Sequence, residues 1–524
     1  MDLLRRRFPL ILGGLAFLVL APQYWIALHT PAIGIYHDDS IYLLSAKSLA
    51  EGHGYRIPST PTNMVQTKYP ILYPAILSLV WRIFPDFPAN VIWFKALSLT
   101  FCLGWFWLSA LMLRRWFADT AITVSLIALI AACPQVIFLS TTALSEMLFA
   151  CLLTGCLVLL LHAETSRSPA WLVGAGILAG GCFLTRSVGF VLLVTPTLYL
   201  LFHRPWKRAV WFGLPAALLT APWLWWQFHN YNAGLDPYLS HANYYSGYNV
   251  LLNYTWLDKG RIVALNLFHL LLSTYGLFCD ILPKELGFLI SIVVFALGLR
   301  GSLRDHSGQL LRWAALGNIV ILMLWVWPPL RFLIPWLTIL VGIAWRGVPV
   351  RLRNYGLAMV WILFVCALIS DSRHTMQARE TGFWYPSAVG SQDWKAFVSL
   401  AQWAKSNTDP QAVFQSNIDP TVYLYTGRKS IRGFRGNVAL GQYLQTAYPL
   451  GTTEEFRATL IRSKVQFLLV VDWTWFPEKK YIKQFLVEME QGYPGELRMV
   501  HNGPPGFGIY RFNVTPSALS SKAH

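Results

Sequence analysis

The feature that most constrains this chain is a series of apolar segments, each close to the roughly 20 residues that a helix needs to cross a bilayer. Hydrophobic residues make up 55% of the 524 residues and charged residues only 13%, whereas soluble domains carry about a quarter charged residues. A soluble enzyme, a disordered chain and a coiled coil are therefore excluded. The segments predict eleven transmembrane helices, near residues 8–28, 91–113, 120–140, 144–162, 170–185, 187–202, 209–228, 285–300, 311–328, 331–346 and 354–370.

The distribution of lysine and arginine predicts the orientation of these spans, because basic residues concentrate in short cytoplasmic loops. With the triple arginine at positions 5–7 inside, alternate loops collect most of the other basic residues, and the C-terminus lies outside. The shorter apolar segment 69–84 is interrupted by Pro70, Pro74 and Arg82. We interpret it as a helix that lies along the membrane surface.

The net charge of +17 follows largely from this orientation. The inner side of residues 1–370 carries +11, the outer side +1 and the last 154 residues +5. The basic excess is an orientation signal and gives no support for a nucleic-acid partner.

We expect a multi-pass protein of the plasma (inner) membrane. Its first span is an uncleaved anchor rather than a signal peptide, because Ala21-Pro22-Gln23 is a poor cleavage site.

The composition of the chain changes at about residue 371, beyond which it is polar and mixed. Runs 412–415 and 465–471 predict strands, and 391–405 and 477–490 predict helices, so residues 371–524 are expected to form a small extracytoplasmic α/β domain. Residues 1–370 are expected to form a mainly α polytopic membrane helical bundle. It has a first outer loop at 29–90, with surface helices, and a large outer loop at 229–284.

An acidic pair opens the first outer loop. Asp38 and Asp39 follow His37 and precede residues 40–49, whose apolar positions predict an amphipathic helix. One interpretation is structural, with Asp39 capping the helix and Asp38 favouring its positive end. The other is that one carboxylate acts as a general base or metal ligand, and only one of two adjacent acids can point at a given atom.

Glu146 is the one acid of residues 1–370 that cannot be assigned to a loop. It lies at the outer end of a predicted hairpin between two spans. An ionisable group at membrane depth is costly unless it is paired or wet, and it is a functional candidate by default. A structural ion pair is the alternative.

Three cations are expected at the same outer depth. Lys68 precedes Tyr69 at the end of the first loop, Arg186 breaks an apolar run, and Arg331 follows a double proline. Snorkelling to lipid headgroups would explain the arginines without a site. The alternative interpretation is a site. Carboxylates and separate cations at one depth suggest chemistry on an anionic lipid headgroup.

The large outer loop is rich in aromatic and polar residues, among them His241 and Tyr244. Such residues suit stacking and hydrogen bonding to a sugar, and they equally suit a surface loop at an aromatic belt. By contrast, all seven cysteines lie in or beside apolar segments, so neither a disulfide framework nor a CxxC metal site is expected.

Taken in order, these motifs resemble the GT-C superfamily of polyprenyl-phosphate-sugar-dependent glycosyltransferases. The set comprises the acidic pair, the Lys68 stretch, Ser145-Glu146, Leu184-Thr185-Arg186 and Arg331-Phe332-Leu333-Ile334-Pro335. It covers residues 1–370 and is similar to that of the protein O-mannosyltransferases and the lipid A aminoarabinose transferases.

The resemblance implies roles for individual residues. Asp38 or Asp39 would be the catalytic base, Lys68 and Arg331 would hold the lipid phosphate, and Glu146 would be a second acid of the site. In the aminoarabinose transferases a metal-binding glutamate precedes the lysine, and Thr67 stands there instead. His37 with Asp38 is the remaining candidate for a divalent metal, but three suitable ligands are not evident.

The expected reaction moves a sugar from a polyprenyl-phosphate donor to a hydroxyl of a lipid, glycan or protein, with inversion at the anomeric carbon. A phosphate leaving group needs its charge stabilised, and a hydroxyl nucleophile benefits from a carboxylate base. The rival hypotheses are a transporter or flippase of a lipid-linked or anionic solute, and a non-catalytic protein of envelope-glycan assembly. Ionisable residues at the ends of the spans and the lack of a repeat argue against the transporter.

Overall fold

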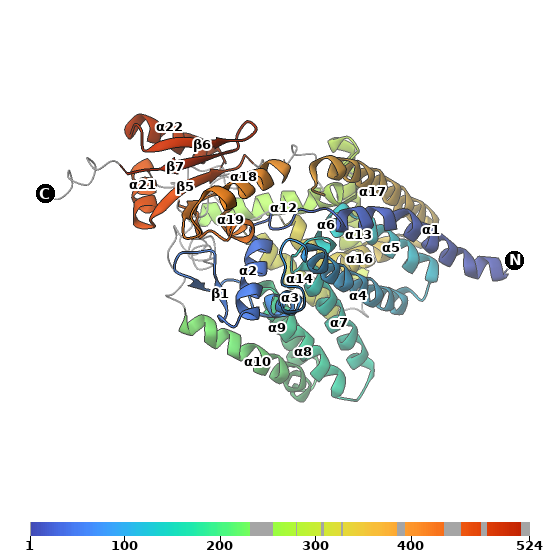
Figure 1. The fold of residues 1–524 in the computed structure, drawn as a ribbon. Helices are drawn as coiled ribbons and strands as arrows, with labels where there is room; N and C mark the ends of the chain where they lie inside the picture. Colours follow the sequence, from blue (N-terminus) through green and yellow to red (C-terminus); the bar gives the residue numbers. More distant parts are fainter. Residues whose placement is uncertain are drawn as a thin grey trace.

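The structure is a computed structural model that describes residues 2–230, 255–278, 280–304, 309–325, 329–384, 394–433, 452–472 and 479–514. Most of them form a helical bundle, and a mixed α/β unit lies at one end of it (Figure 1). The helical elements of the bundle are α1 (Asp2–Leu28), α2 (Asp38–Ala50), α3 (Leu72–Ile83), α4 (Val91–Phe117), α5 (Thr120–Ala131), α6 (Pro134–Ser140), α7 (Glu146–Thr165), α8 (Ala170–Thr185), η1 (Ser187–Gly189), α9 (Phe190–His203), α10 (Trp206–His229), α12 (Trp256–Phe278), α13 (Lys284–Arg304), α14 (Gln309–Met323), α15 (Leu330–Leu333), η3 (Ile334–Trp336), α16 (Leu337–Gly347), η4 (Val350–Leu352) and α17 (Arg353–Thr381).

Each expected span falls on one helix or on consecutive helices. In the part of the chain that the structure describes, seven helices are long and apolar enough to cross a membrane, and the pair α5 and α6, bent by 67°, would be an eighth. The bend follows from Pro134 at the start of α6, since proline cannot continue the hydrogen-bond ladder of α5. Helices α8, η1–α9 and α14 are apolar but shorter.

A long helix, α12, occupies much of the region that the sequence assigns to an outer loop. Apolar residues dominate it, yet Asp258, Lys259 and Arg261 lie in its first turns. Its buried positions fall on one face, where the Asn266 amide donates to the backbone carbonyls of Met323 and Trp325. The sequence predicted a large outer loop over 229–284 without a helix in it, and the described residues Trp256–Phe278 of this region are helical.

The helix predicted over 40–49 is confirmed as part of α2, but it is buried almost all round, so the prediction that it is amphipathic was wrong. Ser40, Ser45 and Ser48 are as buried as the apolar residues between them. The reason is that α3 packs on one side while β1 (Arg56–Ile57), paired with β2 (Met64–Val65), and a helix of the C-terminal unit pack on others. The serines tolerate burial because their hydroxyls are hydrogen-bonded.

The C-terminal unit contains a five-stranded mixed sheet in the order β4-β3-β5-β7-β6. Strand β3 pairs in parallel with β4 and β5, while β7 pairs antiparallel with β5 and β6. The elements are α18 (Trp394–Asn407), β3 (Val413–Gln415), α19 (Asp419–Thr426), β4 (Ser430–Ile431), α21 (Thr453–Arg462), β5 (Val465–Val470), α22 (Lys479–Gly492), β6 (Leu497–Asn502) and β7 (Gly508–Phe512). The sequence predicted β3, β5, α18 and α22 within a few residues but neither β6 nor β7.

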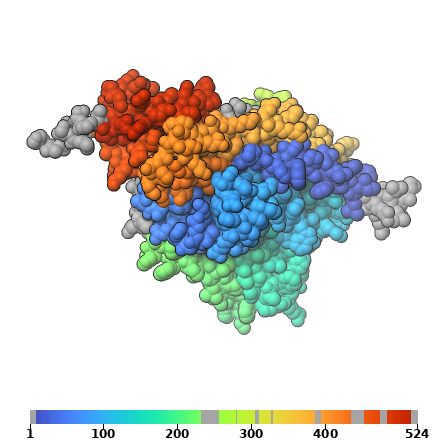
Figure 2. All heavy atoms as spheres, in the orientation of Figure 1, coloured from blue at the N-terminus to red at the C-terminus, as the bar shows by residue number. Residues whose placement is uncertain are grey.

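The C-terminal unit packs directly on the first loop. Figure 2 shows its orange atoms against the blue atoms of the N-terminal part. A single cluster of buried apolar side chains runs from Leu20 of α1 through Ile41 of α2 to Phe397 and Val422 of α18 and α19. Helix α17 also extends beyond residue 371 and ends at Thr381. The two parts therefore share a core where the first loop lies.

Candidate active site

The acidic pair lies in a tight turn that Asp39 holds together. Its carboxylate accepts the backbone N–H groups of Gly34, Ile35, Tyr36 and Ser40 at 2.7–3.1 Å. The N-cap residue of α2 is His37 and Asp39 lies within the first turn, so the interpretation of Asp39 as the N-cap was wrong, although its contacts, including that to the first-turn N–H of Ser40, fit a structural role. Burial raises the pKa of Asp39 to about 6, and the backbone hydrogen bonds oppose the shift. Asp39 is only 2% exposed and is therefore poorly placed to contact a substrate.

Asp38 has a different environment, one residue away. Its side chain is 29% exposed, its Oδ2 accepts Nη1 of Arg331 at 3.1 Å, and its Oδ1 accepts the hydroxyl of Tyr69. Burial acts to raise the pKa of Asp38, but the charges of Arg331 and Lys68 outweigh it and hold the pKa below its usual value. Asp38 is thus an ionised carboxylate within reach of solvent.

Glu146, at the first position of α7, is buried with a side chain only 1% exposed. Its Oε1 lies 2.6 Å from Nη1 of Arg186 and also accepts Nε of Arg331. Arg331 thereby bridges Glu146 and Asp38. The acid that the sequence could not place in a loop is neutralised by two arginines, which explains how it is tolerated at this depth.

Two buried atoms of this network have no hydrogen-bond partner among the described residues: Oε2 of Glu146 and Nη2 of Arg331. A buried donor left unsatisfied costs about 1–3 kcal/mol. An arginine that already binds two carboxylates and keeps one open N–H group is well suited to receive an anionic oxygen.

Arg186 ends α8 in extended backbone and donates to the hydroxyl of Ser145 at 3.1 Å. That hydroxyl lies 3.0 Å from the Tyr42 hydroxyl of α2. The guanidinium groups of Arg186 and Arg331 also stand 5.3 and 5.6 Å from the ring centres of Phe332 and Tyr36. Aromatic rings and hydroxyls thus fix both arginines, so snorkelling into lipid does not describe them.

Lys68 and Tyr69 enter the same region from the end of the first loop. The Lys68 ammonium lies 4.8 Å from the Tyr69 ring centre. Burial lowers the pKa of Lys68 to about 8, while the charge of Asp38 opposes the shift. The side-chain oxygen of Gln66 accepts the backbone N–H groups of Lys68 and Tyr69 at 2.9 and 3.2 Å.

The C-terminal unit also reaches the site. His37, which has a φ of +63°, places Nε2 3.1 Å from Oδ1 of Asp419 at the start of α19. Burial lowers the pKa of His37, and the charges of Arg432 and Lys68 lower it further. Arg432 lies buried just after β4. Sequence reasoning missed Gln66, Asp419 and Arg432, because nothing local connects them to the acidic pair.

Six of the predicted site residues lie close together in the structure, and two lie outside the described residues. Asp38, Lys68, Tyr69, Glu146, Arg186 and Arg331 gather around one network at one end of the bundle, with Asp39 behind it. His241 and Tyr244 lie outside the described residues. Within the described part, no three His, Cys, Asp or Glu side chains are close enough to hold a metal, and the His37 ring faces Asp419 rather than Asp38.

Comparison with known proteins gives the arrangement a context. The family described as dolichyl-phosphate-mannose-protein mannosyltransferase matches residues 68–226. Among solved structures, ArnT from Cupriavidus metallidurans in the apo state is similar, with a TM-score of 0.59 and 14% identity over 96% of this chain and 97% of ArnT. ArnT bound to undecaprenyl phosphate gives a TM-score of 0.58 at 14% identity, over 95% and 97%.

The oligosaccharyltransferase of Archaeoglobus fulgidus in the apo form gives a TM-score of 0.52 at 13% identity, over 95% of this chain and 74% of the other. No curated protein matches the sequence significantly.

The chain has the GT-C fold and resembles the protein O-mannosyltransferases and ArnT. The family match covers part of the GT-C bundle, and this part includes Lys68, Tyr69, Glu146 and Arg186. Asp38 lies before it, and only the structure brings this carboxylate to the matched residues.

Proposed function

We propose that this GT-C protein is a membrane glycosyltransferase that moves a sugar from a polyprenyl-phosphate donor to an acceptor hydroxyl at the outer membrane face. The observation that carries the proposal is the ionised, partly exposed Asp38 beside Arg331, whose Nη2 remains open. The family described as using dolichyl-phosphate-mannose and the likeness to ArnT, solved with undecaprenyl phosphate, support the donor class.

The proposed topology has eleven spans with the N-terminus inside and the C-terminal unit outside. Helix α12 would make a twelfth span by length and composition alone. However, its middle residue Asn266 binds the carbonyls at the end of α14, and Gly276 near its own end packs against Leu330 of α15. We therefore place α12 along the outer boundary of the bundle, so that α10 ends and α13 begins on the same side.

In the proposed reaction, the acceptor hydroxyl attacks the anomeric carbon of the donor sugar. The bond from that carbon to the phosphate oxygen breaks, its electron pair stays on the phosphate, and the hydroxyl proton passes to Asp38. Attack from the face opposite the phosphate inverts the configuration. Arg331 and Lys68 stabilise the negative charge that develops on the leaving phosphate. Such stabilisation by fixed charges is usually the largest single contribution to the rate enhancement.

Glu146 has a positioning role in this scheme rather than a chemical one. It is the more deeply buried of the two carboxylates, and it forms ion pairs with two arginines. Holding Arg186 and Arg331 in one orientation before the donor arrives reduces the reorganisation needed in the transition state.

We further propose that His241 and Tyr244 in the large outer loop contact a sugar, and that the acceptor is a lipid, glycan or protein.

The test is transfer from polyprenyl-phosphate sugars by purified protein in lipid nanodiscs. Asp38→Asn removes the base and should lower transfer or donor hydrolysis by about 10²–10⁴-fold. Asp86→Asn is the matched control, because Asp86 lies exposed in the same outer loop. Donor binding, measured by native mass spectrometry, should persist in Asp38→Asn. Transfer that survives this substitution at the wild-type rate would overturn the assignment of Asp38.

A further inference from the structure

The last turn of α10 binds the loop that carries Lys68. The indole N–H of Trp226 donates to the backbone carbonyl of Gln66 at 3.0 Å. The side-chain amide of Gln227 donates to the carbonyl of Thr67 at 2.9 Å. These two carbonyls belong to the residues that directly precede Lys68. Contacts between positions 160 residues apart in the chain therefore fix the backbone from which this lysine projects.

The backbone of this loop is buried and needs such partners. Gln66 and Thr67 are 0% and 2% exposed, so their carbonyls cannot turn to water, and buried carbonyls are normally hydrogen-bonded. On the far side of Lys68, the hydroxyl of Tyr55 donates to the carbonyl of Tyr69 at 2.8 Å. Removing a donor from α10 would leave a buried carbonyl unsatisfied and would favour displacement of the loop.

A small apolar cluster, separate from the main core, surrounds these contacts. It joins the first loop to the last turns of α8 and α10, and its members are Tyr55, Phe183, Leu184 and Trp223, with Trp226 packed against them. Helix α8 ends at Thr185, and Arg186 of the charged network follows directly. The cluster therefore connects the place where Arg186 leaves α8 with the place where α10 meets the Lys68 loop.

Helices α8 and α10 touch along their backbones. A Cβ atom at Gly176 of α8 would lie only 2.1 Å from the carbonyl oxygen of Phe212 in α10. Such close packing leaves the two helices little room to slide past each other. Because α8 ends beside Arg186 and α10 ends on the Lys68 loop, this helix pair sets the separation of two cations of the network.

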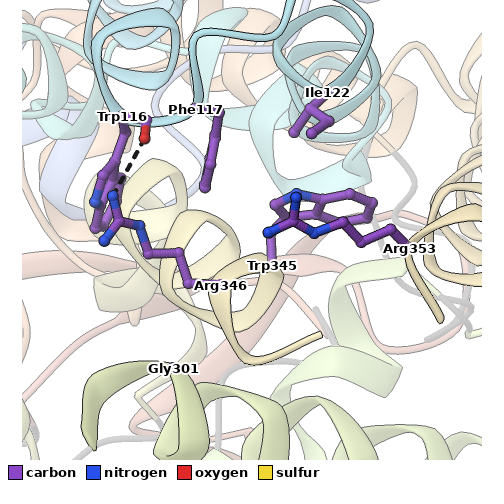
Figure 3. Close-up of a pocket in the computed structure, with 7 residues that line it drawn as sticks. All are labelled: Trp116, Phe117, Ile122, Gly301, Trp345, Arg346 and Arg353. Atoms are coloured by element: carbon purple, nitrogen blue, oxygen red, sulfur yellow. Dashed lines mark hydrogen bonds between the residues drawn. The ribbon is translucent and has the colours of Figure 1, made fainter. Parts of the chain in front are cut away.

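Figure 3 shows a contrasting way to hold a cation, at the C-terminal end of α4. The Arg346 guanidinium donates to the carbonyl of Trp116 at 3.2 Å, beside a cavity that both residues line. That contact occupies an N–H group of the cation itself. The contacts from α10 act on the backbone next to Lys68, so they place the lysine without occupying its ammonium group.

We propose that Trp226 and Gln227 are positioning residues that hold Lys68 at the donor phosphate, so that the end of α10 sets the affinity for the polyprenyl-phosphate donor. The inference rests on the proposed function, in which Lys68 binds this phosphate. It assigns no chemical step to either residue. The half-buried Trp226 differs in this respect from the neighbouring Trp225, which is 64% exposed, as expected of a tryptophan in an aromatic belt.

The first measurement tests the position of the lysine without any donor. Burial holds the pKa of Lys68 at about 8, below its ordinary value of 10.5, against the opposing charge of Asp38. Trp226→Phe and Gln227→Met each remove one donor and keep most of the side-chain volume. Both should raise the pKa of Lys68 by about one pH unit, because water reaches a displaced ammonium. The pKa is read from trace acetylation of the full-length protein in lipid nanodiscs between pH 7 and pH 10, with the Lys68 peptide quantified by mass spectrometry.

The second measurement is binding of undecaprenyl phosphate to the same proteins, by native mass spectrometry at pH 7. Trp226→Phe and Gln227→Met should each weaken binding by about tenfold, the effect of one lost hydrogen bond on the placement of the cation. Trp225→Phe and Phe228→Met are the matched controls on the same turn. Their side chains are 64% and 86% exposed, and both variants should behave as wild type.

The outcomes separate the inference from the proposed function. An acetylation profile of Lys68 that is unchanged in both Trp226→Phe and Gln227→Met would overturn the inference, whatever the lipid does. A shifted profile with unchanged binding of undecaprenyl phosphate would instead contradict the proposed function, because Lys68 would then not hold the phosphate. Equal losses in the variants and in their controls would indicate that α10 is destabilised as a whole, and would also overturn the inference.

Discussion

Asp38 and Asp39 are neighbours in the chain, and their surroundings give them opposite tasks. Asp39 is committed to four backbone N–H groups, while Asp38 meets a tyrosine hydroxyl and an arginine and remains partly exposed. The sequence identified the pair, but it left open which acid would be the proposed base, because the choice depends on the backbone path of the turn. Gly34, with a φ of +85°, lies in that path, and a Cβ there would meet the Ser40 hydroxyl at 2.7 Å.

The sequence drew attention to most of the charged residues that lie together in the candidate site. Glu146, Arg186 and Arg331 are conspicuous because ionisable groups are rare in apolar segments. Gln66, Asp419 and Arg432 were missed because each sits in an ordinary polar stretch and reaches the site only through tertiary packing. His241 and Tyr244 stay predictions.

We expect donor binding to be sensitive to alkaline pH, because Lys68 is one of the proposed phosphate-binding cations. Its pKa is lowered to about 8 by burial, so the ammonium loses its proton, and its charge, as the pH rises through 8. Affinity for a polyprenyl-phosphate donor should therefore fall between pH 7 and pH 9. In Lys68→Arg the charge persists, because arginine stays protonated throughout this range, and the fall should disappear.

This pH dependence is measured by native mass spectrometry or a donor-titration assay at several pH values. Lys47→Arg is the control, because Lys47 lies on α2 beside Glu51 and outside the network. Parallel pH profiles for Lys68→Arg and wild type would rule out Lys68 as the phosphate-binding cation.

At the scale of elements, α19 of the C-terminal unit braces the turn that carries Asp38. The Thr421 hydroxyl donates to the carbonyl of Gly34 and lies 2.8 Å from the hydroxyl of Ser40. Thr421→Val keeps the shape but removes both contacts and leaves only the Ser40 hydroxyl on the Gly34 carbonyl, at a cost of about 0.5–1.5 kcal/mol per hydrogen bond lost. We expect kcat to fall by about tenfold while donor affinity changes little, since the cations are untouched.

Thr426→Val is the matched control on the same helix, because the Thr426 hydroxyl bonds only to Val422 and Arg428 within its own unit. The variants are compared by transfer kinetics and by thermal unfolding. An equal loss of kcat in both would indicate general destabilisation of the C-terminal unit rather than loss of the brace.

The elements also show why the sequence did not predict the helix α12. Asp258, Lys259 and Arg261 lie at its start and the preceding residues have the composition of a loop, although the helix as a whole is apolar enough for a span. Hydropathy alone cannot tell an apolar helix that lies along a boundary from one that crosses the membrane. In contrast, the long helices α4 and α7 were placed correctly because their apolar runs are nearly unbroken.

At the scale of the whole molecule, the placement of α12 decides the sidedness of everything after it. If α12 lies along the outer boundary, Thr255→Cys before it and Lys284→Cys after it should both react with a membrane-impermeant maleimide from outside. Lys207→Cys, at the start of α10, should react only after permeabilisation. The six described cysteines are buried or half-buried, so background labelling should be low.

Labelling of Thr255→Cys and Lys284→Cys from opposite sides would show that α12 crosses the membrane. The C-terminal unit would then lie inside, although it packs on the first outer loop, and the proposed topology would have to be abandoned.

The ratio of acids to cations in the network has a consequence for turnover. The network has two carboxylates, Asp38 and Glu146, and three cations, Lys68, Arg186 and Arg331, so these side chains together carry a net charge of +1. A donor phosphodiester with one negative charge would neutralise this net charge. The proposed transfer would yield a phosphomonoester with a charge approaching −2, and the proton taken up by Asp38 would keep the product complex electroneutral. Once that proton escapes to water, the complex holds excess negative charge, and the spent lipid is repelled. Loss of the proton from Asp38 would thus act as the step that ejects the lipid carrier and resets the enzyme.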